Sequence, residues 1–485
     1  MTAKEVLWYE MIGQEGISPN LLVQCDCFAT VLSLEEMAPV EISCPVPIVS
    51  FRWELRNREK DLILEGIHSF GPEGVDRFAL RDVLPMGRLE PYETESAEYY
   101  LTTAVTLATG DEVRGAFSFV GFLRKGRSAT EVSGMNLRAQ LEAIPVANAS
   151  MTEDQLRQIC MDYMRLELEF PFRMEEDFVF TVESQKRVRR LLGGKVYGGI
   201  PYVTRGAGNL YRIASAYNPA TGTLDTASDI FDNIRYFGNA CSGSASMAWA
   251  RVVSSAYLGY TMFMTEANGF LPVGPYKYPA ENLTKFSRNG ISCKSVCGFN
   301  GEETIYESYA RMKPADGLVC DGHVRMNSSV PVVVRREDGT VDPDQSYTTV
   351  LEQICYVGAS NHIRLAPNGA HYTAQGYVDG RSSFRTLFER GYLPFTFREF
   401  ADPTLVEPAR IRLAVEPELR ERVLSANYPI SDIFVELDGK RYAFHNMEFF
   451  RKEVKMGDVF PPEALTPQTR IFCQLLNGQR LEVLQ

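Results

Sequence analysis

A helical pattern of apolar residues follows a run of small residues near position 240. Four apolar residues recur at steps of three or four and predict one helix face: Ala245, Ala248, Val252 and Ala256. This face is narrow, so another layer of structure can approach it closely. Asn239 is a candidate N-cap, which would leave Cys241 in the first turn of the helix.

Before about residue 145, apolar and polar residues alternate in short runs separated by turn signals. This pattern predicts strands over 21–31, 49–55, 99–107 and 113–122. Several short strands in this order are typical of an antiparallel sandwich, and we expect an immunoglobulin-like one. The one histidine of this region, His68, stands among Ile67, Ser69 and Phe70 and is expected to be a packed residue.

Between about 150 and 400 the pattern changes to mixed helices and strands. Helices are expected over 152–164, with Thr152 or Ser150 as the cap, and over 182–192, 304–311 and 382–389. The stretch 312–326 predicts a strand, a tight Asp321-Gly322 turn and a second strand that starts at His323. A third strand is expected over 347–353.

The last part of the chain predicts strands again. Two hairpins are expected over 433–444 and 470–484, with turns at Asp438-Gly439 and Asn477-Gly478. The pattern therefore predicts three units: a β-sandwich over 1–148, a mixed α+β unit over 149–400 and a C-terminal β domain over 401–485.

Composition narrows the range of partners. The chain has 485 residues, 45% of them hydrophobic, and a formal net charge of −12, which argues against nucleic acid or an anionic membrane as the main partner. No apolar run reaches the roughly 18 residues that a membrane-spanning helix needs. No secretory signal is visible at the N-terminus, so we expect a cytoplasmic protein, with export by another route left open. The oligomeric state is also left open.

The ten cysteines are irregularly spaced, which favours reduced thiols over a disulfide framework. The pairs Cys25/Cys27 and Cys293/Cys297 lack a second pair at zinc-site spacing. We therefore expect neither a metal site nor a cofactor.

The order of three residues suggests nucleophilic catalysis. Cys241 at a helix N-terminus would have a favoured thiolate, His323 at the start of a strand could take its proton, and Glu352 on the next strand could align the imidazole. This is the layout of papain-like hydrolases. Since a shift of one residue changes the face of a strand, Gln353 remains the alternative to Glu352. The simpler interpretation of Cys241 is a small buried apolar residue.

These stretches resemble the NlpC-type cell-wall peptidases and their CHAP-domain relatives. The likeness rests on four short motifs in order: Gly199-Ile200-Pro201-Tyr202, Cys241-Ser242-Gly243, Lys313-Pro314-Ala315-Asp316 followed by Gly322-His323-Val324, and Val350-Leu351-Glu352-Gln353. The resemblance implies a papain-like (NlpC/CHAP-type) α+β domain, with Cys241, His323 and Glu352 catalytic. It also implies that Tyr202 lines the site, and we expect Tyr202, Ser242 and Gln353 to contact the substrate.

The resemblance implies hydrolysis of an amide bond in a peptidoglycan-derived peptide. In that family an aspartate usually precedes the cysteine and binds a free amine of the substrate, whereas this chain has Ala240. The Trp-Gly-Gly that usually follows the tyrosine is replaced by Thr204-Arg205-Gly206. These departures leave the exact bond open. A second hypothesis is a transglutaminase-like acyl transferase, although Arg325 stands where that class has an aromatic residue. A third is a papain-like domain that binds peptide without cleaving it.

Overall fold

The computed structural model is a multi-sheet α+β protein with several antiparallel sheets. The residues it describes are 24–25, 34, 38, 41–57, 62–92, 99–115, 135–176, 178–182, 187–191, 196–200, 203, 206, 208–231, 237–256, 270–278, 292–353, 364–365, 371–373, 376–416, 421–446, 448 and 450–483. None of the helices in these ranges is both long enough and apolar enough to cross a membrane.

The N-terminal unit is built around the long strand β2 (Glu41–Asn57). Four strands pair with it in one six-stranded antiparallel sheet: β1 (Gln24–Cys25), β3 (Leu62–Ser69), β4 (Val75–Ala79) and β5 (Tyr99–Leu107). The sixth strand, β6 (Glu112–Gly115), pairs with β5. Phe51, Trp53 and Leu55 alternate along β2 and are buried with the short helices α2 (Leu80–Val83) and α3 (Met86–Leu89) in a separate core. In the described residues this is one sheet, whereas the sequence predicted two packed sheets.

The central unit contains an eight-stranded sheet whose neighbours all pair antiparallel. Its order is β13 (Phe270–Pro272), β20 (Leu393–Phe397), β14 (Gly317–Cys320), β15 (His323–Asn327), β16 (Tyr347–Gln353), β19 (Gly376–Ser383), β18 (His371–Thr373) and β17 (Arg364–Leu365). The expected strand–turn–strand at 312–326 and the expected strand at 347–353 are confirmed as β14, β15 and β16.

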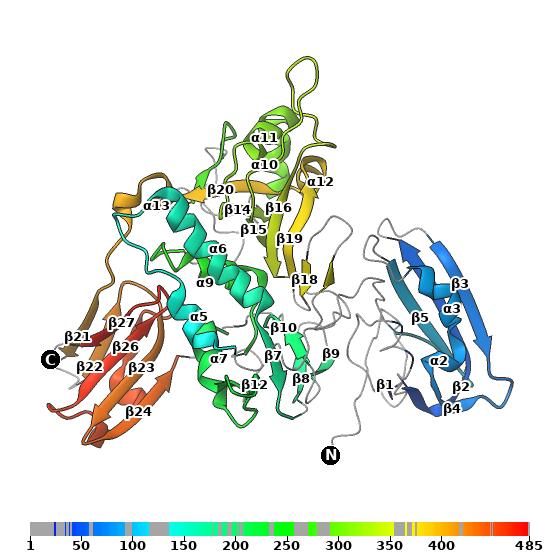
Figure 1. Ribbon diagram of the computed structural model, residues 1–485, viewed down its shortest axis with the longest axis horizontal. Helices are drawn as coiled ribbons and strands as arrows, with labels where there is room; N and C mark the ends of the chain where they lie inside the picture. The colour runs from blue at the N-terminus through cyan, green and yellow to red at the C-terminus, as the bar shows by residue number, and fades with distance from the viewer. Residues whose placement is uncertain are drawn as a thin grey trace.

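Two antiparallel helices, α6 (Glu153–Glu169) and α9 (Cys241–Trp249), pack on this sheet (Figure 1). Thr152 and Gln155 form a capping box at the start of α6, which confirms the expected helix start. The small face of α9 is buried, and Ala245 and Ala248 have no exposed surface. Their short side chains let α6 approach closely.

Shorter helices complete the central unit. They are α5 (Leu137–Ala143), α7 (Leu210–Ala216), α10 (Cys293–Asn300), α11 (Glu302–Tyr309), α12 (Phe384–Glu389) and α13 (Arg398–Ala401). The expected helices at 304–311 and 382–389 correspond to α11 and α12. Leu137 and Leu141 of α5 belong to the central core, although they lie within the range that the sequence assigned to the N-terminal unit.

A smaller sheet borders α6, and the residues that follow its strand β7 contradict one of the sequence predictions. Its strands are β10 (Val196–Gly198), β7 (Pro171–Met174), β12 (Thr223–Leu224) and β11 (Tyr217–Asn218). The helix predicted over 182–192 is wrong, because this stretch enters the separate hairpin β8 (Phe178–Val182) and β9 (Arg187–Leu191). Most of the mispredicted stretch that is described forms β9, Arg-Val-Arg-Arg-Leu, which pairs along its whole length with β8, Phe-Val-Phe-Thr-Val. The aromatic and β-branched residues of β8 favour extended pairing, and this partner strand holds β9 extended.

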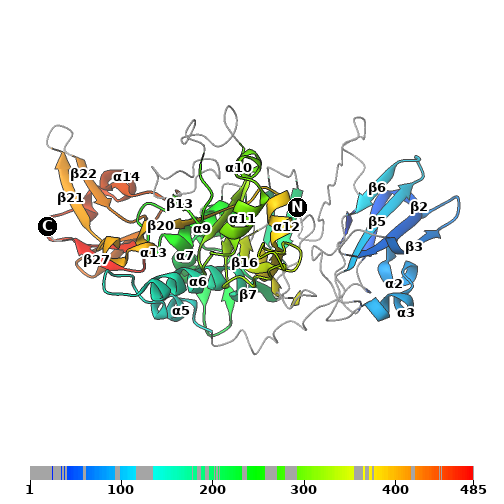
Figure 2. The ribbon, with the colours of Figure 1, turned by 90° about the horizontal axis from the view of Figure 1, so that it is seen from above.

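The C-terminal unit consists of two antiparallel sheets around one core. One contains β21 (Ile411–Glu416), β22 (Glu421–Ala426) and β25 (Glu453–Lys455); the other contains β24 (Lys440–His445), β23 (Ile430–Leu437), β26 (Arg470–Leu475) and β27 (Arg480–Val483). Both expected hairpins are confirmed. The two flanking units lie on opposite sides of the central unit (Figures 1 and 2).

Arg251, just beyond α9, joins the central and C-terminal units. Its guanidinium is fully buried and donates to the carbonyls of Ile144 (3.2 Å) and Leu476 (3.3 Å) and to the Tyr211 hydroxyl. The helix that carries Cys241 is therefore tied at its far end to the turn between β26 and β27.

Candidate active site

The residue at the N-cap of α9 is not the one that the sequence predicted. Ala240, with φ −90° and ψ 172°, occupies the N-cap position and makes no side-chain cap bond. The prediction that Asn239 caps the helix is wrong, because its Nδ2 donates to the Gly208 carbonyl at 2.6 Å and to Oε1 of Glu167 at 3.0 Å. The first-turn N–H groups of α9 therefore lack a side-chain cap.

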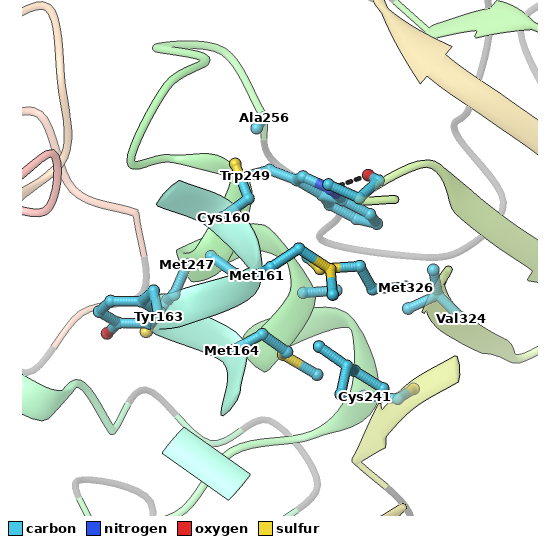
Figure 3. Packing of buried hydrophobic residues seen from close by; sticks show 14 of the residues in the cluster. Cys160, Met161, Tyr163, Met164, Cys241, Met247, Trp249, Ala256, Val324 and Met326 are labelled. Carbon is cyan, nitrogen blue, oxygen red and sulfur yellow. Dashed lines mark hydrogen bonds between the residues drawn. The ribbon is translucent and has the colours of Figure 1, made fainter. Parts of the chain in front are cut away.

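Cys241 is the first residue of α9 and is 5% exposed. It lies in the same apolar cluster as Met164 and Val324 (Figure 3). Its thiol is hydrogen-bonded to the His323 side chain and to main-chain groups of Val324 and Ser242. Burial would raise the pKa of the thiol, but the hydrogen bond and charge of His323 and the two main-chain bonds lower it below its ordinary value.

The other described cysteines provide a contrast. Burial raises the pKa of six of them: Cys44, Cys160, Cys293, Cys297, Cys320 and Cys473. These six and Cys241 are all free and buried, so exposure does not distinguish them. Among these seven cysteines, Cys241 is thus the one thiol whose surroundings favour the thiolate.

His323 is placed by the tight turn between β14 and β15. Gly322 has a φ of 85°, a conformation that glycine adopts without strain, and Cys320 pairs with His323 across the turn. Nε2 of His323 lies 2.5 Å from Oε1 of Glu352, which leaves Nδ1 as the ring nitrogen for the thiol. Burial alone would lower the pKa of His323, but the bonds to Cys241 and Glu352 raise it to about 9.

Glu352, rather than Gln353, contacts the histidine. The two side chains point to opposite faces of β16: Glu352 is 3% exposed and meets His323, whereas Gln353 Nε2 donates to the Ile200 carbonyl at 3.1 Å. The pairing of β16 with β19 shifts register between Val350 and Glu352, an irregularity that the sequence pattern did not indicate.

Arg325 is a fourth member of the cluster that the sequence did not predict as a site residue. Its Nε donates to Oε1 of Glu352 at 2.8 Å, its Nη1 donates to the Ser382 hydroxyl at 3.1 Å, and its guanidinium lies 4.6 Å from the centre of the Tyr392 ring. Burial would raise the pKa of Glu352, but the charge of Arg325 and the contact with His323 keep it below its ordinary value. The sequence did contain a signal for Arg325: it follows His323 by two residues on one strand, and such residues lie on the same face of the sheet.

The four side chains form a largely buried row of alternating charge. The pKa of Cys241 is lowered and that of His323 is raised, and both shifts favour a thiolate–imidazolium pair over the neutral pair. Glu352 is negative beside this imidazolium, and Arg325 is positive beside Glu352. Each charge has an opposite neighbour, which offsets the cost of removing it from water.

A second buried ion pair fixes the start of β14. Nη1 of Arg157 on α6 lies 2.7 Å from Oδ1 of Asp316 and also donates to the Pro314 carbonyl at 2.7 Å. The residue between them, Ala315, has a φ of 66°, and its carbonyl accepts the Trp249 indole N–H at 2.8 Å. These bonds attach the strand before His323 to both helices.

The remaining predicted site residues have different positions. Tyr202 lies outside the described residues, as do Thr204 and Arg205. Ser242 is half-buried at the second position of α9, next to the thiol. Gln353 is fully buried, and its Oε1 lacks a hydrogen-bond partner among the described residues. No group of three or more potential metal ligands comes together within the described ranges.

Comparison with known proteins gives no family. No protein-family model matches the chain, and no curated protein matches it.

Proposed function

We propose that the protein is a cysteine peptidase or amidase that hydrolyses an amide bond with Cys241, His323 and Glu352. The single observation that carries the proposal is the position of His323, whose imidazole is bonded to the Cys241 thiol and to the Glu352 carboxylate at once. This is the geometry by which a base activates a nucleophile and is itself oriented by a third group.

In the first step, the Cys241 thiolate attacks the carbonyl carbon of the substrate and forms a C–S bond. The negative charge moves to the carbonyl oxygen. The main-chain N–H of Cys241, at the uncapped start of α9, is suited to stabilise that oxyanion, because first-turn N–H groups have no partner within the helix. The His323 imidazolium then protonates the leaving nitrogen, the C–N bond breaks and a thioester remains.

In the second step, neutral His323 takes a proton from water, and the resulting hydroxide attacks the thioester. The C–S bond breaks, the acid product leaves, and the thiolate–imidazolium pair is restored. Throughout, Glu352 compensates the charge of the imidazolium, while Arg325 keeps Glu352 ionised.

The substrate class follows from the resemblance to NlpC-type and CHAP peptidases, with a papain-like central domain flanked by β domains. We propose a peptide of peptidoglycan origin. Ala240 stands where that family has the amine-gripping aspartate, and it offers no charge to a free amino group. A substrate without a free α-amine beside the scissile bond is therefore the better candidate.

The test is alkylation by iodoacetamide at neutral pH, with each cysteine followed by mass spectrometry. Cys241 should react faster than the other cysteines, and His323→Ala should slow its reaction at least about tenfold, since an ordinary thiol is mostly protonated at that pH. Cys160 in the same sample is the matched control, because it is buried and free but has no histidine partner in the part of the chain that the structure describes. Equal reactivity of Cys241 in both proteins would contradict the proposal.

The class of reaction is tested by turnover of stem peptides, with Cys241→Ala as the inactive control. Release of an amine and an acid supports hydrolysis. Incorporation of an added primary amine into the acyl product would instead indicate an acyl transferase of the transglutaminase type. Binding of peptides without turnover by the intact protein would favour a binding domain.

A further inference from the structure

Tyr392 borders the row of charged side chains at Arg325. It is 2% exposed, and the central carbon of the Arg325 guanidinium lies over its ring, 4.6 Å from the ring centre. The His323 ring meets the Tyr392 ring edge to face, with 6.5 Å between the two ring centres. One buried aromatic side chain therefore lies beside both the histidine and the arginine of the site.

The main chain of Tyr392 is fixed by the end of α12. Gly391 follows this helix with a φ of 75°, and its N–H donates to the Phe388 carbonyl at 2.8 Å. The Tyr392 N–H donates to the Leu387 carbonyl at 2.9 Å. These two bonds form a Schellman motif, in which a glycine takes the left-handed position. The Tyr392 carbonyl also accepts the Tyr309 hydroxyl at 2.6 Å, so this residue cannot shift without losing several bonds.

The Tyr392 ring is anchored to the hairpin that carries the histidine. β20 pairs with β14 so that Leu393 lies opposite Val319, which brings Tyr392 beside Cys320. The side chains of Tyr392 and Cys320 are hydrogen-bonded to each other. Cys320 in turn pairs with His323 across the turn between β14 and β15.

The position of the ring affects how Arg325 meets its partners. A guanidinium that lies over an aromatic ring keeps the N–H groups at its edge available for hydrogen bonds. Here Nε donates to Oε1 of Glu352 at 2.8 Å, and Nη1 donates to the Ser382 hydroxyl at 3.1 Å. The negative face of the ring attracts the cation without taking either of these N–H groups. It therefore holds a long, flexible side chain in the one orientation that serves Glu352.

We propose that Tyr392 is a positioning residue whose ring face holds the Arg325 guanidinium in the orientation that bonds Glu352. The inference rests on the proposed function, because it assigns a role in supporting the Cys241–His323 pair. It assigns that role to the negative face of the ring, and it assigns none to the hydroxyl group or to packing alone.

The experiment is the iodoacetamide labelling rate of Cys241 in the full-length protein at neutral pH. Tyr392→Leu removes the ring face and loosens the cation that compensates buried Glu352. A less compensated carboxylate gains a proton more readily and supports the imidazolium less, so the rate should fall by about threefold or more. Tyr392→Phe keeps the ring face and should restore the rate to within about twofold of the wild type.

The matched control is Tyr306→Leu, which removes a buried ring from α11 of the same unit. Tyr306 is 3% exposed and packs on Phe388, with 5.4 Å between the ring centres. This variant loses a comparable amount of packing, but its Cys241 should label at the wild-type rate.

Pentafluorophenylalanine at position 392 separates electrostatics from packing. It keeps the shape of phenylalanine but removes the negative charge from the ring face, so the ring no longer attracts the guanidinium. The labelling rate should fall as it does in Tyr392→Leu. Because this side chain fits the same space, it keeps the test decisive even where Tyr392→Leu does not fold.

A double-mutant cycle tests whether Tyr392 acts through Arg325. Arg325→Met leaves no cation for the ring to hold, so adding Tyr392→Leu to it should lower the rate by less than about 1.5-fold. The inference is overturned if the fluorinated ring labels at the wild-type rate, if Tyr392→Phe or Tyr306→Leu loses as much as Tyr392→Leu, or if the two losses in the cycle multiply. A wild-type Cys241 that labels no faster than Cys160 would instead contradict the proposed function itself.

Discussion

Arg325 and Glu352 form a buried ion pair, with Nε of Arg325 2.8 Å from Oε1 of Glu352. The same oxygen contacts Nε2 of His323 at 2.5 Å. The carboxylate is therefore shared between a permanent cation and an imidazole. Because arginine stays charged at every accessible pH, it holds Glu352 ionised while the histidine gains and loses its proton.

The first prediction concerns the charge of Glu352. Glu352→Gln keeps the shape of the side chain but removes the charge that helps to raise the pKa of His323. We expect the labelling rate of Cys241 by iodoacetamide at neutral pH to fall by about 10- to 100-fold, which corresponds to one to two pKa units. Glu337→Gln, on an exposed turn, is the control and should leave the rate unchanged. An unchanged rate in Glu352→Gln would mean that the carboxylate does not support the ion pair.

The placement of His323 and Glu352 on neighbouring strands was predictable from the sequence because it depends on local signals. An Asp-Gly turn places His323 at the start of β15, and sequential antiparallel strands are usually neighbours, which brings Glu352 beside it. The choice between Glu352 and Gln353 was not predictable. It depends on the register of β16, which shifts near Val350, and register is a property of the assembled sheet.

Glu167 could not have been found from the sequence. It lies 72 residues before Asn239 and reads as one more polar residue at the end of an amphipathic helix. Its role depends on the antiparallel packing of α6 against α9, which no spacing indicates. The packing of α6 against α9 also explains why the predicted N-cap was wrong. The Asn239 amide donates to Glu167 of α6, and the Asn239 side chain does not cap α9.

The second prediction concerns the pair between Arg157 and Asp316. Both side chains are almost fully buried. Asp316→Asn therefore removes the negative charge beside Nη1 of Arg157 and leaves the buried guanidinium less well compensated. We expect the free energy of unfolding to fall by about 3 kcal/mol, measured by urea denaturation. The matched control is Glu307→Gln, which breaks an exposed pair with Arg335 and should change stability very little. A similar loss in both variants would contradict a special role for the buried pair.

The third prediction is the effect of pH on stability through Glu167. The folded-state pKa, about 7, is above the ordinary value of 4.5, so the folded protein holds a proton that the unfolded chain has released between these two values. Its contribution to stability is therefore fully present below about pH 4.5 and is lost as pH rises to about 7. The loss should be on the order of 3 kcal/mol.

Urea unfolding across this window checks the third prediction, with Glu167→Gln as the comparison. The variant cannot ionise, so the difference in stability between it and the wild type should grow in favour of the variant as pH rises. A constant difference would show that Glu167 titrates alike in the folded and unfolded chain.

The last prediction compares two glycines in hairpin turns of the C-terminal unit. Gly439 and Gly478 both have positive φ, 75° and 101°, so alanine at either position costs roughly 1–2 kcal/mol in backbone strain. A side-chain carbon at Gly439 would meet nothing within 4 Å, whereas at Gly478 it would lie 2.6 Å from Nη1 of Arg251. The Arg251 guanidinium is fully buried, so it cannot move aside without losing its bonds to the Ile144 and Leu476 carbonyls. We therefore expect Gly478→Ala to destabilise the protein by at least about 1 kcal/mol more than Gly439→Ala in urea unfolding. Equal losses would mean that the contact between α9 and the C-terminal unit yields without cost, and that Arg251 does not fix the far end of the helix that carries Cys241.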